Sequence, residues 1–194
     1  MDNERIRFLK RDLSKILSAH RYDHTIGVAD TAFLLAGMYG ADPDKAYLTG
    51  LLHDNAKAYS SDELLKQAIQ FNLEITPIER RFPALLHAKV GAYYAKEKYG
   101  IDDEDILNAI AYHTTGRPNM TVLEKIIYIA DYIEPGRDRQ PNLNVIRKAA
   151  FTDIDTALLM ILSDTVGYLK ATKPDGVDPL TEETYIFYED SKWK

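Results

Sequence analysis

One stretch near residue 50 constrains this chain more than any other, because it places an imidazole and a carboxylate at the end of an apolar helix. The apolar residues within 46–52 predict a helix that delivers the adjacent His53 and Asp54 to the protein interior. A buried ionised aspartate is costly unless a cation or several hydrogen bonds compensate it, and a neutral imidazole beside it can bind the same cation. The pair is therefore compatible with a metal site and with a hydrogen-bonded core histidine.

Length and composition limit the class of protein and of metal site. The chain has 194 residues, which suits one domain, 1–194, with a sizeable core. Hydrophobic residues make up 45% and charged residues 28%, which is typical of a soluble globular protein. There is no cysteine, so any metal ion must be bound by imidazole and carboxylate groups.

Charge and hydropathy indicate where the chain works and what it does not bind. The formal net charge of −6 argues against broad nucleic-acid binding, so a polyphosphate substrate would need a local basic pocket. No apolar run is long enough to span a bilayer, and the N-terminus is polar and acidic, which predicts a cytoplasmic protein without a signal peptide. Whether the chain forms a homodimer is left open.

Helix signals recur along nearly the whole chain. Ser60 with Glu63 and Thr121 with Glu124 have the spacing of capping boxes, and Asp42 precedes a proline as an N-cap would. Apolar residues at helical spacing, together with these start signals, predict helices at about 4–17, 23–39, 43–54, 61–71, 83–99, 103–113, 122–134, 143–151 and 154–170, and a short helix that begins at 77. The fold class is therefore a single all-α domain.

The end of the chain is less clear than the rest. The segment after residue 173 is rich in aromatic residues and could form a hairpin, a short helix or a contact with a partner; these residues are Tyr185, Phe187, Tyr188 and Trp193. The residues that carry motifs lie at about 21–139, and the C-terminal helices and aromatic tail occupy 140–194.

Four of the five histidines fall on four different predicted helices or helix ends. They are His24 at a helix start, His53, His87, and His113 at a helix C-terminus. Asp131 lies on a strongly apolar helix. Each alone could be a hydrogen-bonded core residue, but helical bundles build di-metal sites from such inward-facing imidazoles and carboxylates. The fifth histidine, His20, is interpreted as a surface residue.

The order of these residues resembles the two-metal HD-domain pattern of metal-dependent phosphohydrolases. Within that class, segments 21–28, 51–57, 112–118 and 131–137 resemble the YqeK family, which is described as symmetrical dinucleoside tetraphosphate hydrolases. The resemblance spans about residues 21–139. Asn55 and the Ala88-Lys89 pair depart from the family pattern, at the periphery of the expected site.

The resemblance implies a particular set of metal ligands. One ion is expected on His24, His53, Asp54 and Asp131, and a second on His87 and His113, with Asp54 bridging the two. The ions are expected to be divalent transition metals, most simply iron, while manganese or cobalt would fit chemically. Two such ions would hold a hydroxide between them that attacks the substrate.

Basic residues are the candidates for contacts with phosphate. Lys57 lies one helical turn beyond His53 and is assigned a catalytic role together with Asp54. Arg117, Arg137 and Arg139 follow the ligand-bearing segments and are candidates for binding the substrate, although each could also be a solvated surface charge.

The expected activity is hydrolysis of diadenosine tetraphosphate to two ADP. Another HD-type phosphohydrolase acting on nucleoside di- or triphosphates or (p)ppGpp is the closest alternative. A di-iron HD oxygenase and a non-catalytic nucleotide sensor are further alternatives. The pair of Lys57 and Arg117 favours phosphate over the organic substrate of an oxygenase, and the complete set of ligands argues against a sensor.

Overall fold

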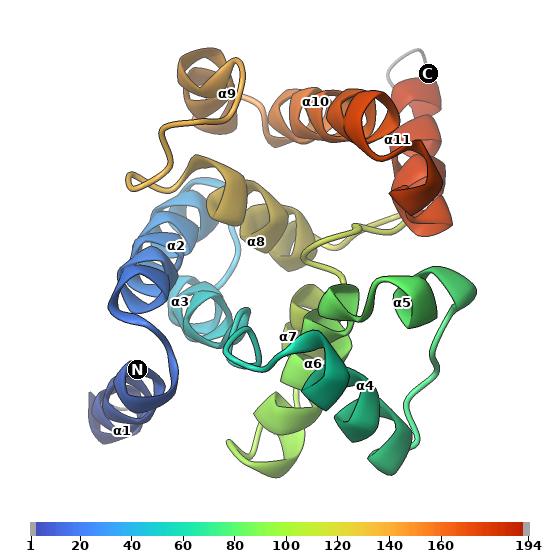
Figure 1. Cartoon of the computed structure of the whole chain (residues 1–194). Coiled ribbons are helices and arrows are strands. Elements are labelled where there is room, and N and C mark those ends of the chain that lie inside the picture. Colours follow the sequence, from blue (N-terminus) through green and yellow to red (C-terminus); the bar gives the residue numbers. More distant parts are fainter. Residues whose placement is uncertain (1–2, 192–194) are drawn as a thin grey trace.

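The computed structural model describes residues 3–191, and all the regular structure in that range is helical (Figure 1). The all-α prediction is confirmed. The elements are α1 (Asn3–Ile16), α2 (Ala19–Met38), α3 (Pro43–Leu52), α4 (Ser61–Gln70), α5 (Pro77–Arg81), the 3-10 helix η1 (Pro83–Leu86), α6 (His87–Glu97), α7 (Glu104–Ala111), α8 (Val122–Ile133), α9 (Leu143–Ala150), α10 (Ile154–Thr172), the 3-10 helix η2 (Pro174–Gly176) and α11 (Pro179–Ser191).

The predicted capping residues start their helices. Ser60 and Thr121 form capping boxes with Glu63 and Glu124, and the side chain of Asp42 accepts hydrogen bonds at the start of α3. These caps satisfy backbone N–H groups that a helix leaves without a partner at its first turn. Local sequence therefore sets most helix starts in this fold.

Helix α8 lies at the centre of the bundle and packs against α2, α3, α7 and α10 (Figure 1). Its side chains Ile126, Ile127, Ile129 and Ala130 are fully buried. The apolar sequence around Asp131 thus places this carboxylate on a core helix, as expected.

Helices α2 and α3 make the most extensive contact between any two elements of the described chain. A Cβ atom at Gly50 of α3 would lie only 2.7 Å from the Cα atom of Ala29 in α2. Only glycine permits this close backbone approach. It brings the end of α3, with His53 and Asp54, toward α2.

The largest cluster of buried side chains joins both ends of the described chain, from Leu9 in α1 to Tyr188 in α11. One core thus runs through the described residues; that residues 1–194 form one domain stays a prediction. Of the three options for the tail, the structure shows a helix, α11, and the N–H of Met120 donates to the Tyr188 hydroxyl across 2.7 Å. Trp193 lies outside the described residues.

Three predicted helix boundaries were wrong near the histidines. Helix α2 begins four residues earlier than predicted because Ser18 caps it, so His24 lies inside the helix. The predicted helix 83–99 is divided into η1 and α6, which meet at His87. Helix α7 ends at Ala111, so His113 lies in the turn that follows.

Among residues 3–191, no helix combines the length and the apolar character that crossing a membrane requires.

Candidate metal centre

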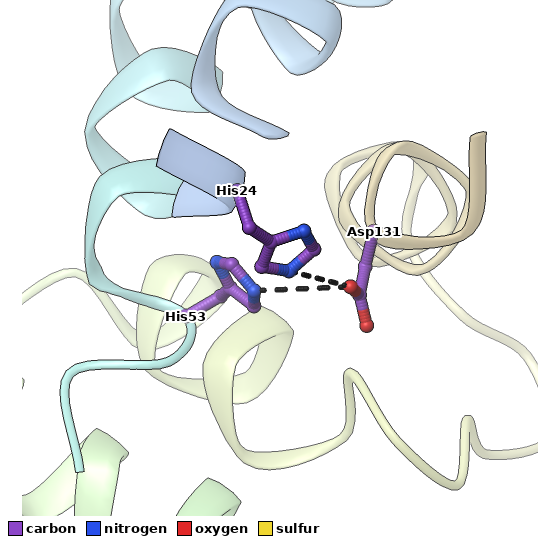
Figure 2. A group of neighbouring side chains, drawn as sticks. All are labelled: His24, His53 and Asp131. Atoms are coloured by element: carbon purple, nitrogen blue, oxygen red, sulfur yellow. Dashed lines mark ion pairs between the residues drawn. The ribbon is translucent and has the colours of Figure 1, made fainter. Parts of the chain in front are cut away.

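The six residues expected to bind metal converge in the middle of the bundle. They come from α2, the turn after α3, the start of α6, the turn after α7, and α8. Figure 2 shows His24 and His53 pointing from neighbouring segments at the Asp131 carboxylate; their Nε2 atoms lie 3.0 and 4.0 Å from Asp131 Oδ1. His87 and His113 also approach each other, with 3.2 Å between their Nε2 atoms.

Asp54 lies between the two pairs of histidines. Its Oδ2 atom is 3.9 Å from His24 Nε2 and 3.6 Å from His53 Nε2. Its Oδ1 atom is 3.3 Å from His87 Nε2 and 3.5 Å from His113 Nε2. Each carboxylate oxygen therefore faces a different pair of imidazoles, which is the arrangement that a carboxylate shared by two ions requires.

Three of the four rings are oriented by the backbone just before them. The Nδ1–H groups of His53, His87 and His113 donate to the carbonyl three residues earlier, that of Gly50, Ala84 or Ile110, across 2.6–2.7 Å. Each of these histidines follows the end of a helix, where carbonyls have no partner within the helix. Helix ends thus turn three Nε2 atoms toward the centre.

His24 is oriented differently, because it lies inside α2 where the carbonyls are used by the helix itself. Its Nδ1 atom lies 3.0 Å from the Glu134 Oε1 atom, which belongs to a residue 110 positions away. Glu134 is buried, with only 3% of its surface exposed. The sequence patterns did not reveal Glu134 as a partner of His24.

The residues present fit a divalent cation. Two buried polar atoms, His53 Nε2 and Asp54 Oδ1, have no hydrogen-bond partner within the described part of the chain. Leaving such groups unsatisfied in the interior costs about 1–3 kcal/mol each. A cation bound between them would use both lone pairs. The imidazole and carboxylate donors suit a transition metal, so the cluster indicates a metal-dependent protein.

The protonation states of His53, Asp54 and Asp131 also suit metal binding. Burial lowers the pKa of His53 to about 4, so its imidazole is neutral near pH 7. Burial alone would raise the pKa of Asp54, but the surrounding imidazoles, that of His53 foremost, hold it well below its ordinary value. Burial alone would also raise the pKa of Asp131, but the hydrogen bond with His24 and the electrostatic interactions with His53 and Arg137 together lower it. Deprotonated ligands of this kind are the ones that bind metal ions.

Three cationic side chains adjoin the cluster. Lys57 Nζ lies 3.1 Å from His87 Nε2, and burial lowers the pKa of its ammonium group. The Arg21 guanidinium donates to Asp54 Oδ2 across 2.9 Å, and Arg137 donates to Asp131 Oδ1 across 2.5 Å. Sequence reasoning named Lys57 and Arg137 but missed Arg21. Its position three residues before His24, on the same face of α2, could have revealed it.

Asn55, a departure from the family pattern, has a structural role. Its side-chain amide donates to the carbonyls of Leu52 and Gly91, across 2.8 and 2.9 Å. It therefore ties the turn that carries His53 and Asp54 to helix α6, which begins with His87.

Two of the proposed substrate residues lie farther from the cluster. Arg117 makes a two-point ion pair with the buried Glu124 carboxylate, with N–O distances of 2.7 and 3.1 Å, and stacks over Tyr112. The Arg139 side chain is 95% exposed and pairs with Asp138. His20 is exposed, as expected.

The fold and the cluster together define a class of protein. A family model described as the HD domain matches residues 21–136, which is more than half of the chain, so the chain belongs to the HD-domain family. A crystal structure from Clostridium acetobutylicum, described as a "predicted HD superfamily hydrolase involved in NAD metabolism", matches with a TM-score of 0.90 and 41% identity. The match covers 96% of this chain and 97% of that one.

Similarity to named relatives is close over most of the chain. The symmetrical bis(5'-nucleosyl)-tetraphosphatase of Halalkalibacterium halodurans is 47% identical over 89% of this chain and 92% of that protein. The protein of the same name from Bacillus subtilis is 43% identical over 89% of both chains. These relatives confirm the resemblance to the YqeK family.

Proposed function

We propose that this protein hydrolyses diadenosine tetraphosphate symmetrically to two ADP. The observation that carries the proposal is that all six side chains expected to bind metal meet in one cluster, within a fold shared with symmetrical tetraphosphatases at 43–47% identity. The symmetry of cleavage comes from the relatives and not from the geometry of the site.

The ligand set divides into two halves, each of which would hold one divalent ion. His24, His53 and Asp131 lie on the side of Asp54 Oδ2, and His87 and His113 lie on the side of Oδ1. When bound, such ions polarise a phosphoryl oxygen and make water a better nucleophile. Iron is the proposed metal by family resemblance, with manganese or cobalt as chemical alternatives.

Side chains beside the cluster supply the remaining chemistry. Lys57 can carry a proton on Nζ and donate it to the departing phosphate, since its lowered pKa makes that proton easier to release. The guanidinium groups of Arg21 and Arg137 can each bind phosphate oxygens at two points. These three cations would offset the charge of the polyphosphate in an acidic protein.

A cavity of about 650 Å³ opens beside His24, and Arg137 and Arg139 line part of its wall. Its volume lies in the range of small-molecule sites. It offers a place for one nucleoside half of the substrate, which gives Arg139 a role at the rim. Arg117 remains a proposed phosphate contact, although it would have to act while paired with Glu124.

Analysis of the products tests the proposal. The purified protein, loaded with Fe²⁺ or with Mn²⁺, is incubated with diadenosine tetraphosphate, and the nucleotides are separated by ion-exchange chromatography. We expect ADP as the only product, two per substrate. AMP with ATP in equal amounts would refute symmetrical cleavage. Faster turnover of (p)ppGpp or nucleoside triphosphates, or a need for oxygen, would favour the alternative functions.

Assembly is a separate proposal. The sequence allows a homodimer but does not predict one. Sedimentation analysis of the full chain at several concentrations would decide between monomer and dimer.

A further inference from the structure

The four histidines of the cluster are not held in the same way. His53, His87 and His113 each donate to a backbone carbonyl three residues earlier. Such a carbonyl is available because carbonyls at the end of a helix have no partner within the helix. His24 lies inside α2 and has the Glu134 carboxylate as the partner of its Nδ1 atom, 3.0 Å away. The orientation of His24 thus depends on a side chain from a distant part of the chain.

Two glycines make room for this carboxylate. A Cβ atom at Gly27 would lie 2.6 Å from Glu134 Oε2, and a Cβ atom at Gly136 would lie 3.0 Å from it. The Gly136 N–H donates to the same oxygen across 2.5 Å. Both oxygens of Glu134 therefore accept a hydrogen bond from an N–H group, one from His24 and one from Gly136.

Arg147 of α9 anchors the turn that carries Glu134. Its guanidinium group donates to three backbone carbonyls, those of Ile133, Glu134 and Arg137, across 2.8–2.9 Å. All three of these contacts are with the backbone of the turn, so Arg147 acts on the site through this turn.

We propose that Glu134, anchored by Arg147, is a positioning residue that keeps the proton of His24 on Nδ1 and leaves Nε2 free to bind the metal ion. A carboxylate that accepts from the distal N–H of a metal-binding imidazole fixes its orientation and tautomer. The inference rests on the proposed metal-dependent function, but it concerns binding and not turnover.

Glu134→Gln is the sharpest test, because it keeps the shape and removes one acceptor. An amide has one oxygen for the two N–H donors, His24 and Gly136. If the oxygen faces Gly136, the amide NH₂ faces His24 and favours the tautomer with its proton on Nε2, which cannot bind metal. If the oxygen faces His24, the NH₂ opposes the Gly136 N–H and the turn is displaced.

The measurement is a titration of the metal-free protein with Mn²⁺, with free Mn²⁺ followed by electron paramagnetic resonance. We expect Glu134→Gln to weaken Mn²⁺ binding at the site that includes His24 by about 10–100-fold. Glu79→Gln is the matched control, since Glu79 is also a buried glutamate, but its carboxylate accepts from the Thr76 N–H and from Lys89. It should bind Mn²⁺ as the unchanged protein does.

Arg147→Met provides an independent arm, because it alters the anchor and leaves the carboxylate in place. It should weaken Mn²⁺ binding in the same direction, whereas Lys148→Met, an exposed neighbour on α9, should not. If Glu134→Gln does not fold, Arg147→Met decides alone.

The tautomer of His24 supplies a readout that a purely structural role would not move. In the Zn²⁺-loaded protein, ¹H–¹⁵N spectra of the imidazole rings should show His24 protonated on Nδ1, and this signal should be lost or displaced in Glu134→Gln. Normal Mn²⁺ affinity in both Glu134→Gln and Arg147→Met would overturn the inference. Absence of Mn²⁺ binding by the unchanged protein would instead refute the proposed metal-dependent function.

Discussion

Asp54 lies within 3.9 Å of four imidazole nitrogens and of the Arg21 guanidinium. Because its two oxygens face different pairs of histidines, removing the carboxylate takes a ligand from both proposed ions. We predict that Asp54→Ala loses both metal ions, while His87→Ala retains the one on the side of His24. Elemental analysis of the purified variants measures this, and full occupancy in Asp54→Ala would contradict the bridging role.

Lys57 is close to the ligands, but its ammonium group has no lone pair and cannot bind a cation while it is charged. Lys57→Ala should therefore keep its metal content and its fold and lose turnover by about 100-fold, the scale of one electrostatic group. Metal content and rate are measured on the same preparation. An unchanged rate would mean that Lys57 has no part in catalysis. A loss of metal would mean that Lys57 helps to hold His87 in place.

At the scale of helices, the contact between α2 and α3 determines how close His24 comes to His53. The centroids of the two imidazole rings are 5.4 Å apart. Gly50→Ala would force a Cβ atom against the backbone of Ala29. We predict a loss of about 1–3 kcal/mol in the free energy of unfolding, together with weaker metal binding as the helices separate.

Gly167→Ala is the control for this prediction. Gly167 lies within α10, and a Cβ atom there would meet no atom within 4 Å. The substitution should stabilise the helix by about 0.5–1 kcal/mol. Urea unfolding of both variants gives the comparison, and equal effects at the two glycines would show that the α2–α3 contact is not as tight as described.

For the molecule as a whole, bound metal should join helices that come from distant parts of the chain. A ligand at about 100 times its dissociation constant stabilises the folded state by about 2.7 kcal/mol. Chelation should then lower the melting temperature by about 5–10 °C for a chain of this size. Asp54→Ala should not respond to the chelator, and an equal shift in that variant would assign the effect to the chelator itself.

The N-terminal helix is held to the body of the protein by a pair that depends on pH. Asp12 of α1 accepts from Lys98 Nζ and from the Tyr99 hydroxyl, each across 2.8 Å. The hydrogen bond from Lys98 is the main reason why the pKa of Asp12 is below its ordinary value. A carboxylate with a lowered pKa stabilises the fold above the pKa of the unfolded chain, and this contribution disappears as the pH falls through the folded pKa.

We therefore predict that Asp12→Asn is less stable than the unchanged protein by about 0.5–1 kcal/mol, the range of exposed pairs. The difference should be constant between pH 7 and pH 5 and should shrink below about pH 4. Denaturant unfolding at a series of pH values measures it. A difference that persists at the lowest pH would mean that the aspartate acts through packing and not through its charge.

The sequence by itself determined the helices and the identity of the metal-binding candidates. Caps such as Ser60 with Glu63 and Thr121 with Glu124 act within one turn, so their signals are local and readable from the chain alone. The candidate ligands were identified because their order resembles a known family, and the structure brings these residues together.

Only the tertiary structure decided how the site is assembled. That Glu134 orients His24 and that Arg21 reaches Asp54 are outcomes of side chains meeting across helices. No local pattern records such contacts, because the partners are separated by as many as 110 residues and meet only when the helices pack. The same reason explains why Asp54 presents one oxygen to each pair of histidines: the packing of α2, α6, α7 and α8 around the end of α3 sets that division.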